Sequence, residues 1–278
     1  MAGRFSRSLE LAQASWSVIR ADKELLLFPV LSVCALLLIV GSLAVPVLAL
    51  GRFTPEALGE SAYLFAFFFY VVSYFIALFF NTALVGAAMI RMDGGNPTLK
   101  DGLAIAWARV GKILAYAVIA ATVGLLLRAI EERVGWLGRI VVKLVGVAWA
   151  LATFMVVPVL VTRDVGPVDA VKESANLLRE TWGENLIGNA GLSVVFAVAY
   201  FALFIVCGGA IFFAATANMA FLAGTLLLAG IVTFLFLSTL QATMQGVYSA
   251  ALYRYATKNG APTPGFSGDL MSLAFKSK

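Results

Sequence analysis

Histidine is missing from this sequence, and charged residues make up only 13% of its 278 positions. The absence of histidine removes the commonest protein ligand of zinc and the usual proton carrier near neutral pH. The two cysteines, Cys34 and Cys207, lie in separate apolar segments and lack the spacing of a metal motif. The G-x-S-x-G, H-E-x-x-H, Walker A and Rossmann glycine patterns are also absent. We therefore predict a protein that is not an enzyme, with no catalytic residues, no metal and no cofactor.

Charge is scarce because apolar residues replace it: 62% of the chain is hydrophobic, whereas a soluble domain carries about a quarter charged residues. The block from Asn185 to Tyr253 runs 69 residues without a charged side chain. About 20 apolar residues cross a bilayer, so this block predicts two membrane helices, and Thr216–Met219 is its best break. The net charge of +5 does not indicate nucleic-acid binding, because the location of the charges matters more than their sum.

Four further apolar runs lie upstream of this block. The predicted membrane helices cover residues 25–51, 61–90, 113–127 and 144–162, followed by the two helices of 185–253. The fold class is therefore all-α: a polytopic transmembrane bundle of six helices arranged as three hairpins. Residues 128–143 are predicted to form a charged loop, in which Arg128 and Glu132 have the i, i+4 spacing of an ion pair.

Three amphipathic segments precede the hairpins, at residues 4–24, 98–112 and 168–184, and predict helices lying in the membrane interface. Each carries a tryptophan a few residues before an apolar run, and each even-numbered membrane helix ends at an arginine. The predicted interfacial anchors are therefore Trp16, Trp107, Trp182, Arg91, Arg163 and Arg254.

This pattern predicts three parallel repeat units, at about 4–91, 98–163 and 168–254, within one membrane domain spanning residues 1–278; the C-terminal tail covers 255–278. Hydropathy alone is the alternative explanation for the resemblance between the units.

Basic residues are distributed unequally between the two sides of the predicted bundle. The side that holds both termini carries 15 Lys and Arg, and the opposite side carries five. By the positive-inside rule both termini are cytoplasmic, and we expect a multi-pass protein of the bacterial inner membrane. Basic interfacial helices favour anionic head groups, so the expected partners are membrane lipids, anionic ones included. A second copy of the chain or another membrane protein is a further candidate partner.

Polar side chains inside predicted membrane helices are the candidate functional residues. The best candidates are four amides: Asn81, Asn189, Gln241 and Gln245. The structural interpretation is hydrogen bonding between helices, typically worth about 1 kcal/mol in membranes. The functional interpretation is a path for an uncharged solute. No ionisable residue lies in the middle of a predicted membrane helix, which argues against transport coupled to protons or sodium.

The last membrane helix combines two of these amides with small residues. Gln241 and Gln245 lie four residues apart, and Ala242, Gly246 and Ala250 form a ridge at the same spacing. Small residues allow helix backbones to approach closely. The ridge therefore predicts a tight contact with a neighbouring helix.

Two stretches resemble known families. Residues 20–32 (RADKELLLFPVLS), the six helices and the tryptophan-bearing interfacial helices resemble a family of bacterial integral membrane proteins of unknown function. Residues 162–182 (TRDVGPVDAVKESANLLRETW) look like the membrane domain that accompanies some glycerophosphodiester phosphodiesterases. The catalytic histidine and carboxylates of those enzymes are absent, so the resemblance implies a membrane domain without their activity. We expect a non-catalytic membrane protein that organises the membrane or binds lipid or a partner; the alternative is a transporter or channel for a small uncharged solute.

Overall fold

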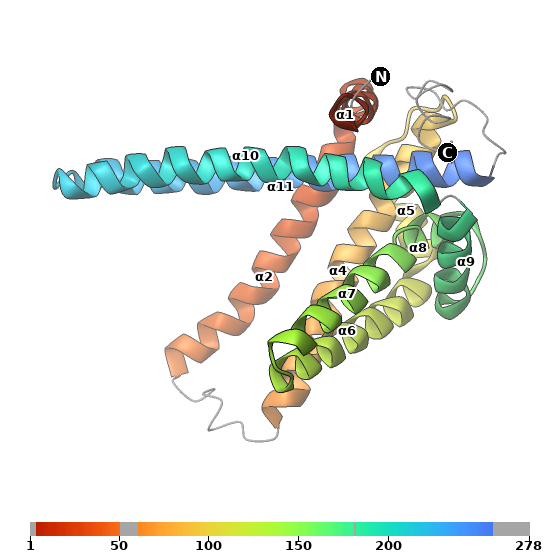
Figure 1. The fold of residues 1–278 in the computed structure, drawn as a ribbon, viewed down its shortest axis with the longest axis horizontal. Helices are drawn as coiled ribbons and strands as arrows, with labels where there is room; N and C mark the ends of the chain where they lie inside the picture. The colour runs from red at the N-terminus through yellow and green to blue at the C-terminus, as the bar shows by residue number, and fades with distance from the viewer. Residues whose placement is uncertain (1–3, 51–60, 181, 258–278) are drawn as a thin grey trace.

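The computed structural model describes residues 4–50, 61–180 and 182–257, and every secondary-structure element in these ranges is a helix (Figure 1). In chain order the elements are α1 (Arg4–Ala21), η1 (Lys23–Leu26), α2 (Leu27–Leu50), α4 (Ser61–Met92), α5 (Leu99–Ala108), α6 (Val110–Arg133), α7 (Trp136–Ala152), α8 (Val156–Thr162), α9 (Pro167–Glu180), α10 (Trp182–Thr216) and α11 (Ala220–Thr257).

Six segments of the described chain are long and apolar enough to cross a membrane. They are Lys23–Ser42, Leu64–Met92, Val110–Arg133, Trp136–Thr162, Leu192–Thr216 and Ala220–Thr257. A helix satisfies its backbone hydrogen bonds internally, which a spanning segment must do where no water is available. The predicted all-α fold with six apolar helices is confirmed, and it is that of a multi-pass membrane protein.

Two turns end helices through residues in the left-handed backbone region. Gly94 has φ +86° after α4, and the amide of Gly95 donates to the carbonyl of Ile90 at 3.0 Å. Asn218 has φ +58° after α10, and the amide of Met219 donates to the carbonyl of Ala214 at 2.9 Å. Glycine and asparagine tolerate this conformation, and the bonds satisfy carbonyls that a helix end leaves unpaired. The predicted break at Thr216–Met219 is therefore the turn of the last hairpin.

The predicted charged loop at 128–143 is wrong, because α6 continues to Arg133 and α7 begins at Trp136. Arg128 pairs with Glu132 at 3.2 Å, as its spacing predicted, and donates to the hydroxyl of Tyr70 at 2.9 Å. These contacts along and beside the helix stabilise the helical path, so charge alone did not indicate a loop.

The fourth membrane segment is broken into α7 and α8 at residues 153–155. Pro158 lies in the first turn of α8, where a missing N–H costs no helical bond. The buried hydroxyl of Ser174, on α9, accepts from the backbone N–H of Met155 at 3.0 Å. A contact from 19 residues away thus satisfies the backbone at the break.

The core lies where α11 crosses the earlier helices. Buried residues of α11 run from Thr243 to Tyr253 and pack against α4, α8 and α1. The short helices α1, α5 and α9, called the collar here, gather at this end of the molecule, the collar side (Figure 1). Each hairpin follows a collar helix along the chain, and the threefold repeat stays a prediction.

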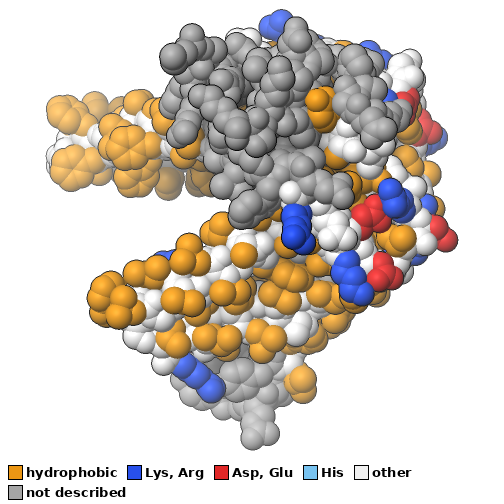
Figure 2. Space-filling view, turned by 45° about the vertical axis from the view of Figure 1, so that its right-hand side comes forward, with side chains coloured by type: hydrophobic (Ala, Val, Ile, Leu, Met, Phe, Trp, Pro, Cys, Tyr) orange, Lys and Arg blue, Asp and Glu red, His pale blue; other side chains and the backbone are white. Residues whose placement is uncertain are grey.

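The α10–α11 hairpin differs in direction from the other helices. It runs across the collar-side ends of α2 and α4 and projects beyond them toward its turn (Figure 1). Its projecting half exposes large apolar side chains, for example Phe213 at 76% and Phe221 at 87%, and apolar side chains also cover the described surface below it (Figure 2).

Helix lengths account for this oblique hairpin. The charge-free part of α11, 220–253, is about 51 Å long at 1.5 Å per residue, whereas a bilayer core is about 30 Å thick. An apolar helix that is too long tilts or thickens the bilayer locally. The charge-free part of α6, 113–127, is only about 22 Å long. The molecule therefore presents a long apolar side and a short one to the membrane.

Candidate functional site

The predicted small-residue ridge forms a close contact between α11 and α4. A Cβ atom added at Gly246 would lie 2.6 Å from Cδ2 of Leu84, closer than carbon atoms pack. Ala250 is fully buried in the same contact. Ala242, one turn earlier, lines a cavity, and Gly246 and Leu84 lie at the edge of the same cavity. The ridge thus brings two helices together at one end and leaves space between them at the other.

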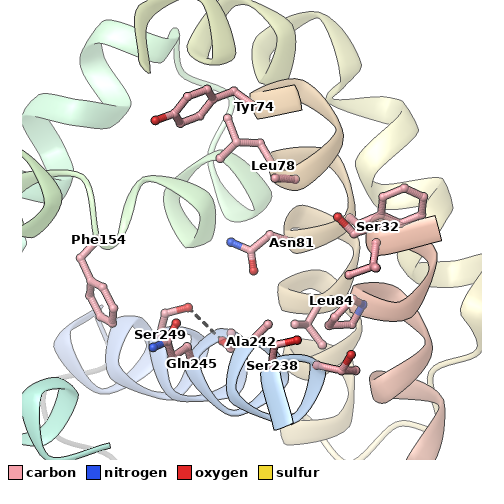
Figure 3. A pocket seen from close by; sticks show the side chains of 16 residues that line it. Ser32, Tyr74, Leu78, Asn81, Leu84, Phe154, Ser238, Ala242, Gln245 and Ser249 are labelled. Atoms are coloured by element: carbon pink, nitrogen blue, oxygen red, sulfur yellow. Dashed lines mark hydrogen bonds between the residues drawn. The ribbon is translucent and has the colours of Figure 1, made fainter. Parts of the chain in front are cut away.

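This space, the amide cavity, has a volume of about 520 Å³ and lies between α2, α4, α11 and the break before α8 (Figure 3). Such a volume suits a small ligand. The described lining residues are Pro29, Ser32, Val33, Tyr74, Ala77, Leu78, Phe80, Asn81, Leu84, Phe154, Ser238, Thr239, Ala242, Gln245, Gly246 and Ser249.

Two of the four predicted amides, Asn81 of α4 and Gln245 of α11, meet in this cavity. In Figure 3 the side chain of Asn81 extends from α4 toward α11. Asn81 lies ten residues before Arg91, and Gln245 nine residues before Arg254, so both are about 14–15 Å along their helices from a charged end. Both side chains are partly buried, and neither makes a side-chain hydrogen bond within the described part of the chain. Their donors and acceptors are available to a ligand.

Three hydroxyl groups that line the amide cavity, unlike the two amides, donate hydrogen bonds to carbonyls of their own helix. The hydroxyls of Ser238 and Thr239 both donate to the carbonyl of Leu235, and the hydroxyl of Ser249 donates to the carbonyl of Gly246. Asn81 and Gln245 therefore supply most of the uncommitted donors. No Asp, Glu, Lys or Arg is among the described residues that line the cavity. The site is polar but uncharged.

Gln241 has a different environment from Gln245, although the two are one turn apart. Its Oε1 accepts from the hydroxyl of Tyr200 at 2.9 Å, which links α11 to α10. This is the interhelical hydrogen bond that the structural interpretation predicted. The fourth amide, Asn189, lies outside the residues whose side chains are described.

An apolar groove along α4 adjoins the amide cavity and is called the α4 groove. It has a volume of about 240 Å³, and its described lining is Phe69, Tyr70, Ser73, Tyr74 and Ala77. It shares Tyr74 and Ala77 with the cavity, and Arg128 binds Tyr70 at its far end. The two spaces together follow α4 away from the collar side.

The three predicted anchor arginines all contact protein groups on the collar side. Arg91 donates to the carbonyl of Ala21 at 3.0 Å, which ties α4 to α1. Arg254 donates to the carbonyl of Met89 at 3.2 Å and pairs with Asp93 at 2.7 Å. Arg163 pairs with Glu173 of α9 at 2.9 Å.

Arg91 and Arg163 each link a hairpin to a collar helix, and Arg254 links α11 to the end of α4, so the three arginines have a structural role. Arg254 is only 12% exposed, whereas Arg163 is 52% exposed.

The tryptophans lie at the surface of the collar where their side chains are described. Trp16 is 37% exposed, with the guanidinium of Arg20 5.8 Å from its ring centroid. Trp107 is 67% exposed and packs edge-on against Phe79 at 5.5 Å. Exposed tryptophans beside charged groups suit a membrane interface. The side chain of Trp182 lies outside the described residues.

Ionised groups on the collar side have shifted pKa values. Burial raises the pKa of Asp22, which is 7% exposed, although its Oδ1 accepts from the amide of Glu24 and Arg91 lies nearby. The ammonium of Lys112 and the guanidinium of Arg109 hold the pKa of the exposed Asp164 below its usual range. Within the described residues, no three Cys, Asp or Glu side chains are grouped so as to hold a metal ion.

Sequence reasoning missed several residues of the amide cavity. Ser32, Tyr74 and Phe154 lie in apolar runs and carry no charge, so nothing separated them from other membrane-facing residues. Ser249 was detectable, because it lies one turn after Gln245 on the same helix.

The family of the chain follows from a comparison with family models. Residues 60–263 match the model of a family of unknown function (DUF6159), so the chain belongs to that family. This agrees with the predicted resemblance to an uncharacterised family. Searches of curated proteins and of solved structures found no match.

Proposed function

Because its family has no assigned function, we propose a function from geometry: the protein is a non-catalytic membrane protein that holds lipid in the amide cavity. The observation that carries this proposal is the partly open cavity of about 520 Å³ between apolar helices. It adjoins the apolar α4 groove, which gives a hydrocarbon chain a place to lie. A lipid is the most abundant molecule that reaches such a site from the bilayer.

A membrane-organising role is part of the same proposal. Charge-free segments of about 22 Å and about 51 Å in one molecule favour different local bilayer thicknesses on its two sides. The exposed apolar half of the α10–α11 hairpin supports contact with lipid or with a partner in the membrane. Basic collar residues support a preference for anionic lipid around the protein.

For the location we propose the bacterial inner membrane with both termini in the cytoplasm. The collar side carries 15 Lys and Arg and the opposite side carries five, which supports this orientation. The resemblance of residues 162–182 to the membrane domain that accompanies some glycerophosphodiester phosphodiesterases stays a proposal of the same kind.

The experiment fills the amide cavity and counts retained lipid. In Ala242→Phe the new ring occupies the cavity, whereas in Ala229→Phe, on the same helix, it lies on the exposed hairpin surface. Native mass spectrometry after detergent washing should show less lipid bound to Ala242→Phe than to wild type or Ala229→Phe. Equal lipid retention by all three proteins would contradict the proposal.

The second candidate function is transport of a small uncharged solute, favoured by two uncommitted amides inside apolar helices. Reconstituted vesicles should then take up neutral solutes faster than empty vesicles, and Asn81→Leu with Gln245→Met should reduce the rate. Uptake equal to that of empty vesicles would exclude this function.

A further inference from the structure

We propose that the amide cavity and the α4 groove form one binding site for an uncharged lipid. Its head carries hydroxyl or carbonyl oxygens that meet Asn81 and Gln245, and its hydrocarbon chain lies along α4. This inference rests on the proposed function and adds the chemical class and the orientation of the ligand.

The chemistry of the lining selects an uncharged head. Asn81 and Gln245 each offer two N–H donors and one carbonyl acceptor, none of which is bonded to another described residue. Hydroxyl and ester groups complement such a set, because they both donate and accept. A phosphate would need a cation, and the described lining supplies none. Placing an unpaired charge at this depth is costly in a membrane.

The depth of the site agrees with this selection. The amides lie about 14–15 Å along their helices from Arg91 and Arg254. A lipid head here lies about two and a half to three helical turns from the charged residues that end α4 and α11.

The length of the groove matches one hydrocarbon chain. From Asn81 to Phe69, the last groove residue, α4 rises about 18 Å. One leaflet of the bilayer core is about 15 Å thick, half of about 30 Å. A chain extending from the amides along Ala77, Tyr74 and Tyr70, away from the collar side, therefore has about the length of one leaflet.

The alternative is that these amides only form hydrogen bonds between helices, as Gln241 does. That side chain is bonded to Tyr200 across the hairpin, and it does not line the cavity. The same helix thus contains a matched pair: an amide used for packing and, one turn later, an amide facing the cavity. The pair gives the experiment its control.

The experiment uses photoactivatable lipids with the full chain in nanodiscs. Diacylglycerol carrying a photoreactive chain is compared with phosphatidylglycerol carrying the same chain, and labelled peptides are identified by mass spectrometry. We expect diacylglycerol to label α4 and α11 peptides around the cavity in preference to phosphatidylglycerol. Asn81→Leu and Gln245→Met should each reduce this labelling about threefold to tenfold, the loss expected for one hydrogen bond in a membrane. Gln241→Met should leave it unchanged.

The outcomes separate the two proposals. Equal or stronger labelling of these peptides by phosphatidylglycerol overturns the uncharged class while leaving a lipid site in place. No labelling by either probe overturns the proposed function as well. Unlabelled diacylglycerol should compete with its labelled form on wild-type protein, which tests the site even if a variant does not fold. Failure to compete would mean that the labelling is non-specific and would overturn the site.

Discussion

Replacing Gly246 with alanine places a methyl group in a close contact between α11 and α4. The added Cβ would lie 2.6 Å from Cδ2 and 3.1 Å from Cγ of Leu84, whereas carbon atoms pack at about 3.5–4.0 Å. Leu84 is only 1% exposed, and the space open to its side chain is the amide cavity, which it lines. Either Leu84 leaves its rotamer or the helices separate by about 1 Å, and overpacking of this kind costs about 1–3 kcal/mol.

The higher helix propensity of alanine stabilises the Gly246→Ala variant and so opposes the cost of overpacking. A control variant is needed to separate the two effects. Alanine is favoured over glycine in a helix interior by about 1 kcal/mol in soluble hosts. Gly230→Ala on the same helix provides the control, because its Cβ would meet Cβ of Cys207 at an ordinary 3.5 Å. The difference in unfolding free energy between the two variants therefore isolates the contact with Leu84.

The assay is unfolding by titration with sodium dodecyl sulfate in mixed micelles, followed by circular dichroism. We expect Gly246→Ala to be less stable than Gly230→Ala by about 1–3 kcal/mol. If the two variants unfold within about 0.5 kcal/mol of each other, well below the cost of overpacking, the close approach of α11 to α4 is refuted.

Two other perturbations test contacts outside the cavity. Tyr200→Phe and Gln241→Met should each lower the free energy of unfolding by about 0.6 to 1.7 kcal/mol, because each removes the same interhelical hydrogen bond. In the same titration the double variant should be no less stable than the less stable single variant. If the two losses of unfolding free energy add fully, the hydrogen bond is not formed. Because burial raises the folded-state pKa of Asp22 above its ordinary 3.8, its ionised form opposes folding, and this loss of stability develops as pH rises through that raised pKa. Asp22→Asn should therefore be more stable than wild type at pH 7, with the difference vanishing below about pH 4, and a constant difference across pH would contradict the shift.

The membrane segments were predictable from the sequence because hydropathy over a long window determines them. Charged residues and turn-forming residues mark their ends, as Gly94 and Asn218 do with left-handed backbones. The loop at 128–143 was mispredicted because a charged segment can stay helical beyond the membrane when pairs such as Arg128–Glu132 lie along it.

The partners of the amides were not predictable. The four-residue spacing of Gln241 and Gln245 places them on one side of α11 but does not say which helix lies opposite each. The crossing of α11 over α4 at Gly246 puts Gln245 at the cavity, while Gln241 meets Tyr200 of α10. Crossing angles depend on packing between distant segments, and no local pattern encodes them. The contact of Ser174 with Met155 is undetectable for the same reason.

The burial of the last helix in the core has a consequence for biosynthesis. Val247, Ala250 and Leu252 are fully buried, and they cover the faces of α4 and α8 against which they pack. At a translation rate of about 5–20 residues per second, roughly 8 to 30 s separate the synthesis of Met92 from that of Ala250. Throughout that interval the face of α4 that packs against α11 in the complete protein has no α11 to cover it. The nascent chain thus needs lipid, or an insertion factor, to shield this face until its final helix emerges from the ribosome.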